Sequence, residues 1–599
     1  MTFLVFAAAA STACDEEPLR NRRNRPAPPD GTAGFDPGDT PPGDGTGAYG
    51  QGASGPGTGG SGTGGSGPGT GGTGTGGSGT ASGPGTGSAV CEGDVQAKFD
   101  WRDSVIYFVF IDRFFDGDAA NNDPLGAPVQ TPADYQGGDF AGVRQKLDEG
   151  YFDELGINTL WLTMPADNAD IAGQGLGGDP YQYSAYHGYW PKDLDAVESR
   201  FGTEQELKGI VDAAHAKGIK VIVDYVMNHV HDTSQVYVDH PDWFWPRQDG
   251  TRDCLCGAAC SWDGPDGRRC WFTPYLPDFD FTKPAARAFS VDNAVAWIDR
   301  LGIDGFRLDA VKHIEDQWLV DLRSRVRADV EPGRGEHFYM VGETFTGDRG
   351  LINAYVDPCA KLDGQFDFPW RMEVTAKLLM RKGSMNDLEG FLSFNENFYG
   401  GGRAVMSTFL GNHDIPRVVH FAQNVPLWND EWNGGKDRNW TNLPAAPAGL
   451  EAYERLATGF TLLLTTKGAP LIYYGDEYGM PGAGDPDNRR FMQWSGYNAG
   501  QSALNAQIKK LTAIRAAHPA TRRGVRAPVS VTTETLAYSM TSPADGDTVY
   551  VALNRSDAAQ AVAGVPAGTY VDELTGADVV VSGNVSVPAR GSLVLVPKP

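Results

Sequence analysis

The sequence predicts an α/β protein built on a (β/α)8 TIM barrel, with a subdomain inserted after the third strand and an antiparallel β-domain at the C-terminus. Between about Ser104 and Ala517, eight short apolar runs alternate with helical stretches. Runs that are apolar throughout indicate parallel strands covered on their outer face. A segment of about 55 residues after Val226 is long enough to form a subdomain. From about Val525 the pattern changes to short alternating runs, which are typical of antiparallel strands.

The expected strands and helices alternate along the chain. Strands are expected at Val105–Ile111, Ile157–Thr163, Ile219–Val226, Gly302–Ala310, His337–Glu343, Leu362–Phe368, Ala404–Leu410 and Ala469–Gly475. Helices are expected at Phe140–Leu155, Glu204–Lys217, Pro284–Leu301, Ile314–Asp329, Arg371–Lys382, Leu450–Thr465 and Ala503–Ala517. This places the barrel at 91–228 and 281–522, the inserted subdomain at 229–280 and the β-domain at 523–599.

The N-terminal part of the chain is expected to lie outside these domains. From Pro28 to Gly87 it consists mostly of Gly, Ser, Thr and Pro, which bury too little apolar surface to offset the entropy of ordering. We therefore expect a flexible linker over residues 27–90. Residues 1–26 begin with an apolar run that is too short to span a bilayer and is typical of an export signal.

Cys14 stands at the end of this apolar run. Small residues precede it and acidic residues follow it, which resembles a bacterial lipoprotein signal. We expect a lipid anchor through Cys14 and a location outside the cytoplasm, either on the cell surface or extracellular. Plain secretion is the alternative, because Ser11 occupies a position where a larger aliphatic residue is usual in a lipoprotein signal.

Charge and cysteine content narrow the class of protein. A formal net charge of −26 argues against a nucleic-acid partner, which would require a basic face. An even number of cysteines after Cys14 favours disulfides in an exported protein. These cysteines are Cys91, Cys254, Cys256, Cys260, Cys270 and Cys359. A zinc site in the Cys254–Cys270 cluster is the alternative, although the paired CxxC spacing is missing. A monomer is expected.

Polar side chains gather where four of the expected strands end. The third strand runs into DYVMNH, the fourth into GFRLDAVKH, the fifth into VGET and the seventh into FLGNHD. One Asp or His at a strand end is often only a cap, but four such ends in one barrel are hard to explain in that way. Barrel enzymes carry their active sites at the carboxyl ends of the strands. The pattern therefore predicts an enzyme that uses several carboxylates.

Together, the four segments resemble the four sequence regions of the α-amylase family of glycoside hydrolases, and the likeness covers about Trp101–Pro599. The resemblance implies that Asp309 is the nucleophile, that Glu343 is the general acid and base, and that Asp414 stabilises the transition state. It also implies a set of contacts to an α-glucan substrate. These contacts are His187, Tyr189, Asp224, His229, Arg307, Lys312, His313, His413, Asp485 and Arg489.

Physical chemistry supports these roles independently of the resemblance. Glycoside hydrolysis needs one carboxylic acid and one carboxylate. Arg307 lies two residues before Asp309 and on the same face of a strand, so its charge is expected to keep Asp309 ionised. Glu343 must begin protonated, so burial and neighbouring carboxylates are expected to raise its pKa. The Asp309 and Glu343 carboxyls are expected about 5–5.5 Å apart.

Two groups of oxygen ligands predict one or two bound Ca²⁺ ions. The first group resembles a site in cyclodextrin glucanotransferases and related amylases, and its alternative is a turn-forming cluster without metal. Its members are Asp116, Asp118, Asn121, Asn122, Asp139 and the carbonyl of Gly137. The second group is implied by the family resemblance and would tie the inserted subdomain to the barrel. Its members are Asn228, Asp278 and the backbone oxygen of His313.

Three functions remain to be weighed. The first is a retaining endo-acting α-amylase, which cleaves α-1,4 bonds in starch, glycogen or malto-oligosaccharides. The second is a transglycosylase of the same family, of the cyclodextrin glucanotransferase or maltogenic amylase type. The third is a glucan binder without activity, which the intact set of carboxylates disfavours. A single β-domain after the barrel, the LPDFD motif and the Lys312–His313 pair favour the first, whereas the first calcium group favours the second.

Overall fold

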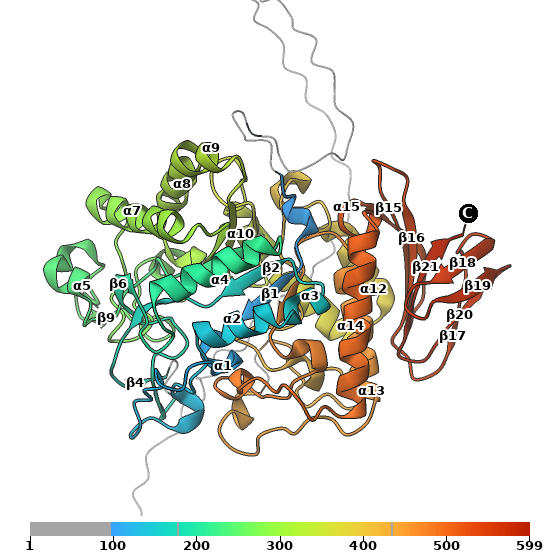
Figure 1. Ribbon diagram of the computed structural model, residues 1–599, viewed down its shortest axis with the longest axis horizontal. Helices are drawn as coiled ribbons and strands as arrows, with labels where there is room; N and C mark the ends of the chain where they lie inside the picture. The colour runs from blue at the N-terminus through green and yellow to red at the C-terminus, as the bar shows by residue number, and fades with distance from the viewer. Residues whose placement is uncertain (1–90, 92–97, 176–178, 433–434, 599) are drawn as a thin grey trace, which may run out of the picture. The chain divides into compact units, whose positions relative to one another are not determined.

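The computed structural model describes Cys91 and residues 98–175, 179–432 and 435–598. The expected export signal, Cys14 and the linker lie outside the described residues. All described residues belong to one compact unit, Ser82–Pro599. Within it, a curled parallel sheet is surrounded by helices, and an antiparallel β-domain packs beside α13 and α14 (Figure 1). Among the described helices, none combines the length and the apolar character needed to cross a membrane.

The central sheet confirms the predicted barrel. Its strand order is β12-β11-β10-β7-β2-β1-β13, and all neighbours are parallel. The strands are β1 (Ile106–Val109), β2 (Thr159–Leu162), β7 (Lys220–Tyr225), β10 (Gly305–Leu308), β11 (Tyr339–Gly342), β12 (Gly364–Gln365) and β13 (Leu471–Tyr473).

The seventh expected strand, Ala404–Leu410, does not form a continuous strand. It makes one parallel bridge from Ser407 to Phe366 and another from Phe409 to Leu471. The same segment makes backbone hydrogen bonds to both β12 and β13. Ser407 N donates to Gln365 O at 3.0 Å, and Leu471 N donates to Thr408 O at 2.8 Å. It therefore fills the gap between β12 and β13 and closes the ring.

The helices cover the outside of the barrel, and most of them match their expected ranges. They are α2 (Phe140–Asp148), α3 (Tyr151–Glu154), α4 (Glu204–Ala216), α7 (Pro284–Leu301), α8 (Asp316–Arg325), α9 (Glu331–Arg334), α10 (Arg349–Ala354), α11 (Phe368–Val374), α12 (Met385–Asn395), α13 (Glu451–Leu464), α14 (Ala499–Ala517) and α15 (Ala520–Arg523). The expectation of a single helix over Phe140–Leu155 is wrong. Gly150, with a φ of 84°, separates α2 from α3, because a left-handed residue cannot continue an α-helix.

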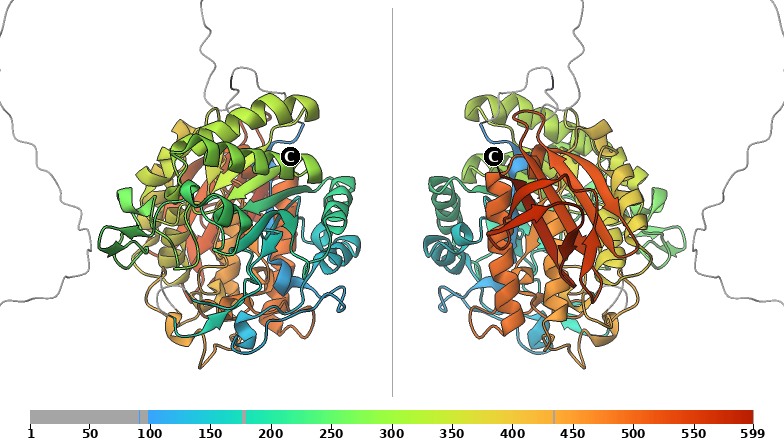
Figure 2. Two further views of the ribbon diagram at one scale, coloured as in Figure 1. Left: turned by 90° about the vertical axis from the view of Figure 1, so that its left-hand side faces the viewer. Right: turned by 90° about the vertical axis from the view of Figure 1, so that its right-hand side faces the viewer.

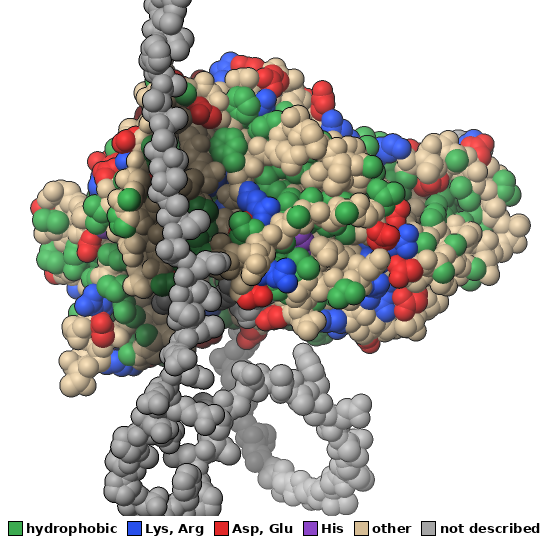
Figure 3. Space-filling model, turned by 90° about the horizontal axis from the view of Figure 1, so that it is seen from below, with side chains coloured by type: hydrophobic (Ala, Val, Ile, Leu, Met, Phe, Trp, Pro, Cys, Tyr) green, Lys and Arg blue, Asp and Glu red, His purple; other side chains and the backbone are tan. Residues whose placement is uncertain are grey.

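Two long segments extend the barrel beyond the carboxyl ends of its strands. Between β2 and α4 lie β3 (Ala166–Asn168), β4 (Gly173–Gln174), β5 (Gln182–Tyr183) and β6 (Pro191–Val197). The inserted segment after β7 contains α5 (Gln235–Asp239), β8 (Gln248–Asp249), β9 (Arg252–Asp253) and α6 (Gly264–Gly267). The short α1 (Ile111–Phe114) follows β1 and lies with β4 at the lower edge of Figure 1. Figure 3 shows this side, over which acidic and basic side chains are interspersed.

Three disulfides pair all six cysteines of the described chain: Cys91–Cys359, Cys254–Cys260 and Cys256–Cys270. The disulfide prediction is thus confirmed. The zinc alternative is wrong for the Cys254–Cys270 cluster. A sulfur bonded to another sulfur cannot act as a thiolate ligand, so the proximity of Cys256, Cys270 and His313 does not make a metal site.

The C-terminal β-domain begins where the alternating pattern begins, at Val525. Its main sheet has the order β14-β15-β16-β21-β18-β19, and β17 pairs with β20 (Figure 2). The strands are β14 (Val525–Val531), β15 (Thr535–Thr541), β16 (Thr548–Asn554), β17 (Gln560–Val562), β18 (Gly568–Asp572), β19 (Ala577–Val581), β20 (Val585–Val587) and β21 (Ser592–Pro597). The domain packs on the barrel through α12, α13 and α15, where Tyr538 bonds Thr465 at 2.6 Å.

Candidate active site

Three neighbouring strands bring carboxylates to one place at their carboxyl ends. Arg307 of β10 lies in register with Asp224 of β7 and with Val341 of β11. Just beyond the paired residues, Asp309 N donates to Tyr225 O at 3.1 Å, and Glu343 N donates to Leu308 O at 2.9 Å. The parallel register therefore sets Asp224, Asp309 and Glu343 around the Arg307 side chain.

The guanidinium of Arg307 contacts all three of these carboxylates. Its Nη1 lies 2.8 Å from Asp224 Oδ1 and 2.5 Å from Asp309 Oδ1, and its Nη2 lies 2.8 Å from Glu343 Oε2. The side chains of Arg307 and Asp224 are 1% and 0% exposed. One positive charge among three buried acids leaves an excess of negative charge, which favours retention of a proton in the cluster.

The surroundings of Glu343 favour its protonated form. Burial raises its pKa to about 8, Arg307 opposes the rise, and the nearby Asp414 and Asp309 add to it. Burial likewise raises the pKa of Asp224 to about 7, against the effect of Arg307. The predicted elevation for Glu343 therefore has the physical cause expected of a general acid.

Asp414 faces the same site from a different strand end and has a different cation. Its Oδ1 lies 3.3 Å from Arg489 Nη2, and its Oδ2 lies 3.4 Å from His413 Nε2. Arg489 also pairs with Asp485 at 3.2 Å. The Asp414 side chain is 33% exposed, whereas Asp309 and Glu343 are 12% and 10% exposed. Asp414 is therefore the most open of the three predicted catalytic carboxylates.

Four of the predicted substrate contacts form one network around Tyr189. The Tyr189 hydroxyl donates to Asp224 Oδ2 at 2.8 Å and lies 2.7 Å from His413 Nε2, whose ring is stacked on that of Tyr189. His187 Nδ1 accepts from Tyr189 N at 3.0 Å, and His229 Nε2 lies 2.9 Å from Tyr189 O. Both the backbone and the ring of Tyr189 are thus held beside the carboxylates.

Sequence reasoning missed two aromatic residues of the site. Tyr186 OH lies 3.3 Å from Asp485 Oδ1 and 3.4 Å from Arg489 Nη1, so it joins the predicted Asp485–Arg489 pair. Tyr186 could have been selected from the sequence, because it begins the YHGYW segment. The ring of Trp161 lies 5.2 Å from the Arg307 guanidinium carbon. Its position inside the apolar β2 gave no sign of this role.

Lys312 and His313 contact the inserted segment rather than the Arg307 guanidinium. Ala310 adopts a left-handed conformation with a φ of 49° directly after Asp309, and the Val311–His313 turn follows it. Lys312 Nζ then pairs with Asp263 Oδ1 at 2.7 Å, and His313 Nδ1 lies 2.6 Å from Gly267 O. Both side chains are therefore held by the inserted segment.

The first predicted calcium group converges around Asp139, which caps α2. Asp139 accepts from Gly142 N at 2.6 Å and from Asn121 Nδ2 at 3.2 Å. Asn122 Nδ2 donates to Asp116 Oδ2 at 2.8 Å, and Asp118 N donates to Asp139 at 2.8 Å. Asn121 Oδ1 is buried and has no hydrogen-bond partner among the described residues. A cavity of about 150 Å³, lined in part by Asn122 and Gly137, borders the group.

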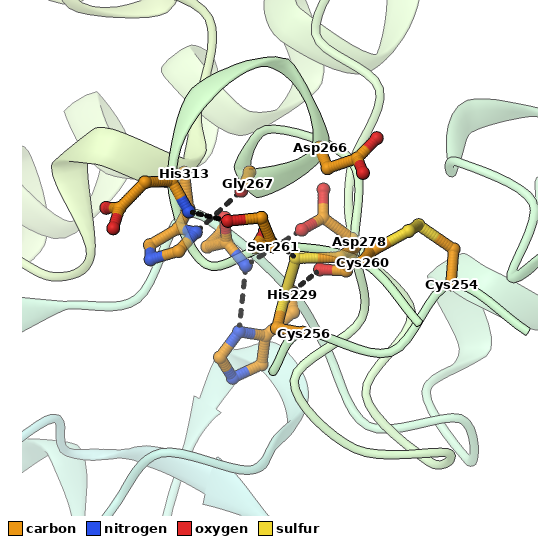
Figure 4. Close-up of a disulfide and its surroundings, with 12 residues drawn as sticks. His229, Cys254, Cys256, Cys260, Ser261, Asp266, Gly267, Asp278 and His313 are labelled. Atoms are coloured by element: carbon orange, nitrogen blue, oxygen red, sulfur yellow. Dashed lines mark hydrogen bonds between the residues drawn. A yellow bond between two sulfur atoms is a disulfide. The ribbon is translucent and has the colours of Figure 1, made fainter. Parts of the chain in front are cut away.

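The second predicted group also contains oxygens without partners. Asn228 Nδ2 donates to Asp278 Oδ2 at 3.1 Å, which leaves Asn228 Oδ1 and Asp278 Oδ1 buried with no hydrogen-bond partner in the described chain. Figure 4 shows Asp278 beside His229 and His313, where the inserted segment meets the barrel. Buried oxygens of this kind require a donor or a cation, and the set fits a hard ion such as Ca²⁺.

A parallel barrel whose strand ends bring several buried carboxylates around one arginine is the architecture of a barrel enzyme that performs acid–base chemistry. The sequence profile of the alpha amylase catalytic domain matches residues 108–521, which is more than half of the chain. The chain therefore belongs to the α-amylase family.

Individual relatives support this assignment. A cyclomaltodextrin glucanotransferase of Geobacillus stearothermophilus is 28% identical over 525 residues, which cover 83% of this chain and 66% of the relative. The crystal structure of an α-amylase from Geobacillus thermoleovorans, complexed with acarbose, has a TM-score of 0.67 at 26% identity. The structure of an Anoxybacillus α-amylase has a TM-score of 0.68 at 27% identity. Each structural match covers 84% of this chain and 100% of the other.

Proposed function

We propose that the chain hydrolyses α-1,4-glucosidic bonds within starch, glycogen or malto-oligosaccharides and retains the anomeric configuration. The Arg307 cluster carries this proposal, because Arg307 contacts both Asp309 and Glu343 and because burial raises the pKa of Glu343 to about 8. Similarity to two α-amylases over their full length supports hydrolysis as the outcome.

The reaction has two balanced steps. In the first, the Asp309 carboxylate attacks the anomeric carbon while Glu343 gives its proton to the glycosidic oxygen, so the C1–O bond breaks and a glycosyl ester forms. In the second, Glu343 accepts a proton from water as the water oxygen attacks C1, and the ester bond to Asp309 breaks. Two inversions at C1 give net retention.

The surrounding residues stabilise and orient the sugar. Asp414, paired with Arg489, is placed to accept hydrogen bonds from sugar hydroxyls and to stabilise positive charge at C1. Tyr189 offers its ring to the sugar, and His187 and His229 hold the Tyr189 backbone. Arg307 moves no proton but holds Asp309 and Glu343 in place.

Product analysis from soluble starch tests the proposal. Linear malto-oligosaccharides with the α configuration, detected by chromatography and by NMR of the freshly released anomers, are the expected products. Inverted anomers would contradict the double-displacement assignment, and the absence of any product would contradict catalysis. Cyclic or elongated products would favour the second candidate.

That second candidate is transglycosylation, in which a sugar hydroxyl replaces water in the second step. Two observations favour it: the glucanotransferase relative and the resemblance of the Asp116–Asp139 group to the cation site of such enzymes. The ratio of transfer to hydrolysis products at high maltose concentration separates the two candidates. A ratio that stays below about one tenth would favour hydrolysis.

We further propose that Ca²⁺ binds both oxygen groups. Asn121 would hold one ion together with Asp116, Asp118, Asn122, Asp139 and Gly137, and Asn228 would hold another with Asp278 and His313. Bound Ca²⁺ would supply positive charge to buried oxygens and tie the inserted segment to β7. Exhaustive EDTA treatment is expected to lower the melting temperature, and added Ca²⁺ to restore it. Unchanged melting after chelation would refute the proposal.

We also propose that the protein acts outside the cytoplasm and is anchored through Cys14. Three disulfides support an oxidising compartment. Metabolic labelling with a clickable fatty acid tests the anchor. The parent protein is expected to be labelled and the Cys14→Ser variant is not. Equal labelling of both would contradict the proposal.

A further inference from the structure

The segment Cys254–Phe272, named here the stapled loop, is held by two disulfides inside the inserted segment. Cys254–Cys260 closes a short loop, and Cys256–Cys270 fastens that loop to the far end of the segment (Figure 4). All four cysteines are buried, and together with Trp262 and Phe272 they form a small apolar core of their own. The stapled loop therefore has a small apolar core of its own, and its Phe272 also packs against the barrel core.

The stapled loop contacts the His313 side chain through one hydrogen bond and two aromatic rings. Gly267 O lies 2.6 Å from His313 Nδ1, and the edges of Phe272 and Trp262 meet the imidazole ring at centroid distances of 4.8 and 5.8 Å. Because a carbonyl oxygen only accepts, Nδ1 must carry the proton. Nε2 makes no hydrogen bond within the described chain, so it is the ring atom left to contact a ligand.

Gly267 has little room to adjust its contact with His313. A Cβ at this position would lie 2.5 Å from the carbonyl oxygen of Trp262. The path of the backbone at the Gly267 carbonyl therefore depends on glycine and on the disulfide that follows three residues later at Cys270.

The stapled loop also holds the Lys312 ammonium. Lys312 Nζ lies 2.7 Å from Asp263 Oδ1 and donates to Phe345 O at 3.2 Å. The Lys312 side chain is 11% exposed, whereas that of Asp263 is 65% exposed. The loop thus supplies a solvent-exposed partner for the largely buried Lys312 side chain.

Lys312 and His313 lie on the side of Glu343. Val311 N donates to Glu343 O at 2.8 Å, and Lys312 binds the carbonyl of Phe345, two residues after Glu343. A general acid gives its proton to the departing oxygen, so the leaving sugars occupy its side. Asp485 and Arg489, in contrast, are attached to Asp414.

We propose that the stapled loop is a positioning element for the leaving-group sugars. Its Gly267 carbonyl and Asp263 carboxylate hold His313 and Lys312 where these two residues bind the sugar units that depart. The inference rests on the proposed glycosidase function. It assigns to the loop the enzyme's preference for substrates that extend beyond the cleaved bond.

Two substrates test the idea, one with leaving sugars and one without them. Maltoheptaose has leaving sugars, whereas α-maltotriosyl fluoride has none. In Gly267→Ala, kcat/KM for maltoheptaose is expected to fall about tenfold, because the loss of one hydrogen bond has about this effect on binding. The fall is expected to come from a higher KM. The value for the fluoride is expected to stay within about twofold. Cys256→Ser/Cys270→Ser is expected to show the same split, and Asp263→Asn a weaker one.

A matched control removes a disulfide elsewhere. Cys91→Ser/Cys359→Ser eliminates the Cys91–Cys359 bond, which joins cysteines outside the stapled loop, and is expected to leave the ratio of the two substrates unchanged. An equal fall for both substrates in Gly267→Ala, or no fall for either, would overturn the positioning role. If the parent protein cleaves neither substrate, the proposed function itself fails, and the two failures are therefore distinguishable.

Discussion

Two clusters of arginine and carboxylate side chains differ mainly in burial. The buried cluster is suited to acid–base chemistry, whereas the exposed cluster joins two domains. Around Arg307, three carboxylates share one guanidinium whose side chain is 1% exposed. Around Asp557, three arginines share one carboxylate whose side chain is 56% exposed. The arginine contacts to Asp557 are Arg455 at 2.9 Å, Arg590 at 3.2 Å and Arg381 at 3.5 Å.

Burial determines what each cluster does. Around Arg307 water cannot screen the excess negative charge. The pKa of Glu343 is therefore raised to about 8. Around Asp557 water reaches the carboxylate, and its partners come from the barrel (Arg381 and Arg455) and from the β-domain (Arg590). Burial and Arg381 lower the pKa of Arg455 to about 10, so it stays charged at neutral pH. The Asp557 cluster therefore holds two domains together without acid–base chemistry.

The largest expected effect comes from removal of the titrating proton at the buried cluster. Glu343→Gln keeps the shape of the side chain but cannot donate a proton, so kcat on starch should fall by about 10²–10⁴-fold. Glu454→Gln, which removes a partner of Arg590 near Asp557, is the matched control and should change kcat less than about twofold. Similar losses in both variants would erase the distinction between the clusters.

The next effect concerns stability rather than rate. Arg307→Met leaves three buried acids without a counter-charge and should lower the free energy of unfolding by about 3–5 kcal/mol. Urea denaturation followed by fluorescence measures this change. A loss below about 1 kcal/mol would mean that water reaches the Arg307 cluster as freely as it reaches Asp557.

The pH dependence of kcat/KM sharpens the assignment of the proton. Because Glu343 must be protonated to act, kcat/KM should decline above a pH of about 8, by about tenfold for each further unit. Neutral Glu343 also stabilises the fold. That contribution is complete below the ordinary pKa of 4.5 and is lost as the pH rises through about 8. An alkaline limb near pH 6 would contradict the proton assignment.

Sequence patterns predicted the barrel and its carboxylates because both depend on local features. Apolar runs mark buried parallel strands, and Asp309 and Glu343 follow directly at the strand ends. The sequence also placed Arg307 on the same face as Asp309. It could not show that Arg307 reaches Glu343 as well, because that contact depends on the register of β10 with β11.

Other parts of the site depend on segments that are distant in the chain. Nothing around Gly267 indicates that its carbonyl meets His313, 46 residues away. The pairing of Cys254 with Cys260 and of Cys256 with Cys270 required the fold, since four cysteines allow several connectivities. The break at Gly150 was visible as a glycine, but its positive φ was not.

The smallest expected effect is a change in the free energy of unfolding at the exposed Asp557 cluster. Asp557→Ala removes the shared carboxylate, but water can solvate Arg381 and Arg590 in its place, so the loss should be about 0.2–1 kcal/mol. Because the attraction is screened, 1 M salt should reduce this loss further, whereas the loss in Arg307→Met should persist. Urea denaturation of both variants at low and high salt measures the difference. A loss above about 2 kcal/mol for Asp557→Ala would show that the buried Arg455 depends on Asp557 as its counter-charge, and that the two clusters differ in function but not in electrostatic strength.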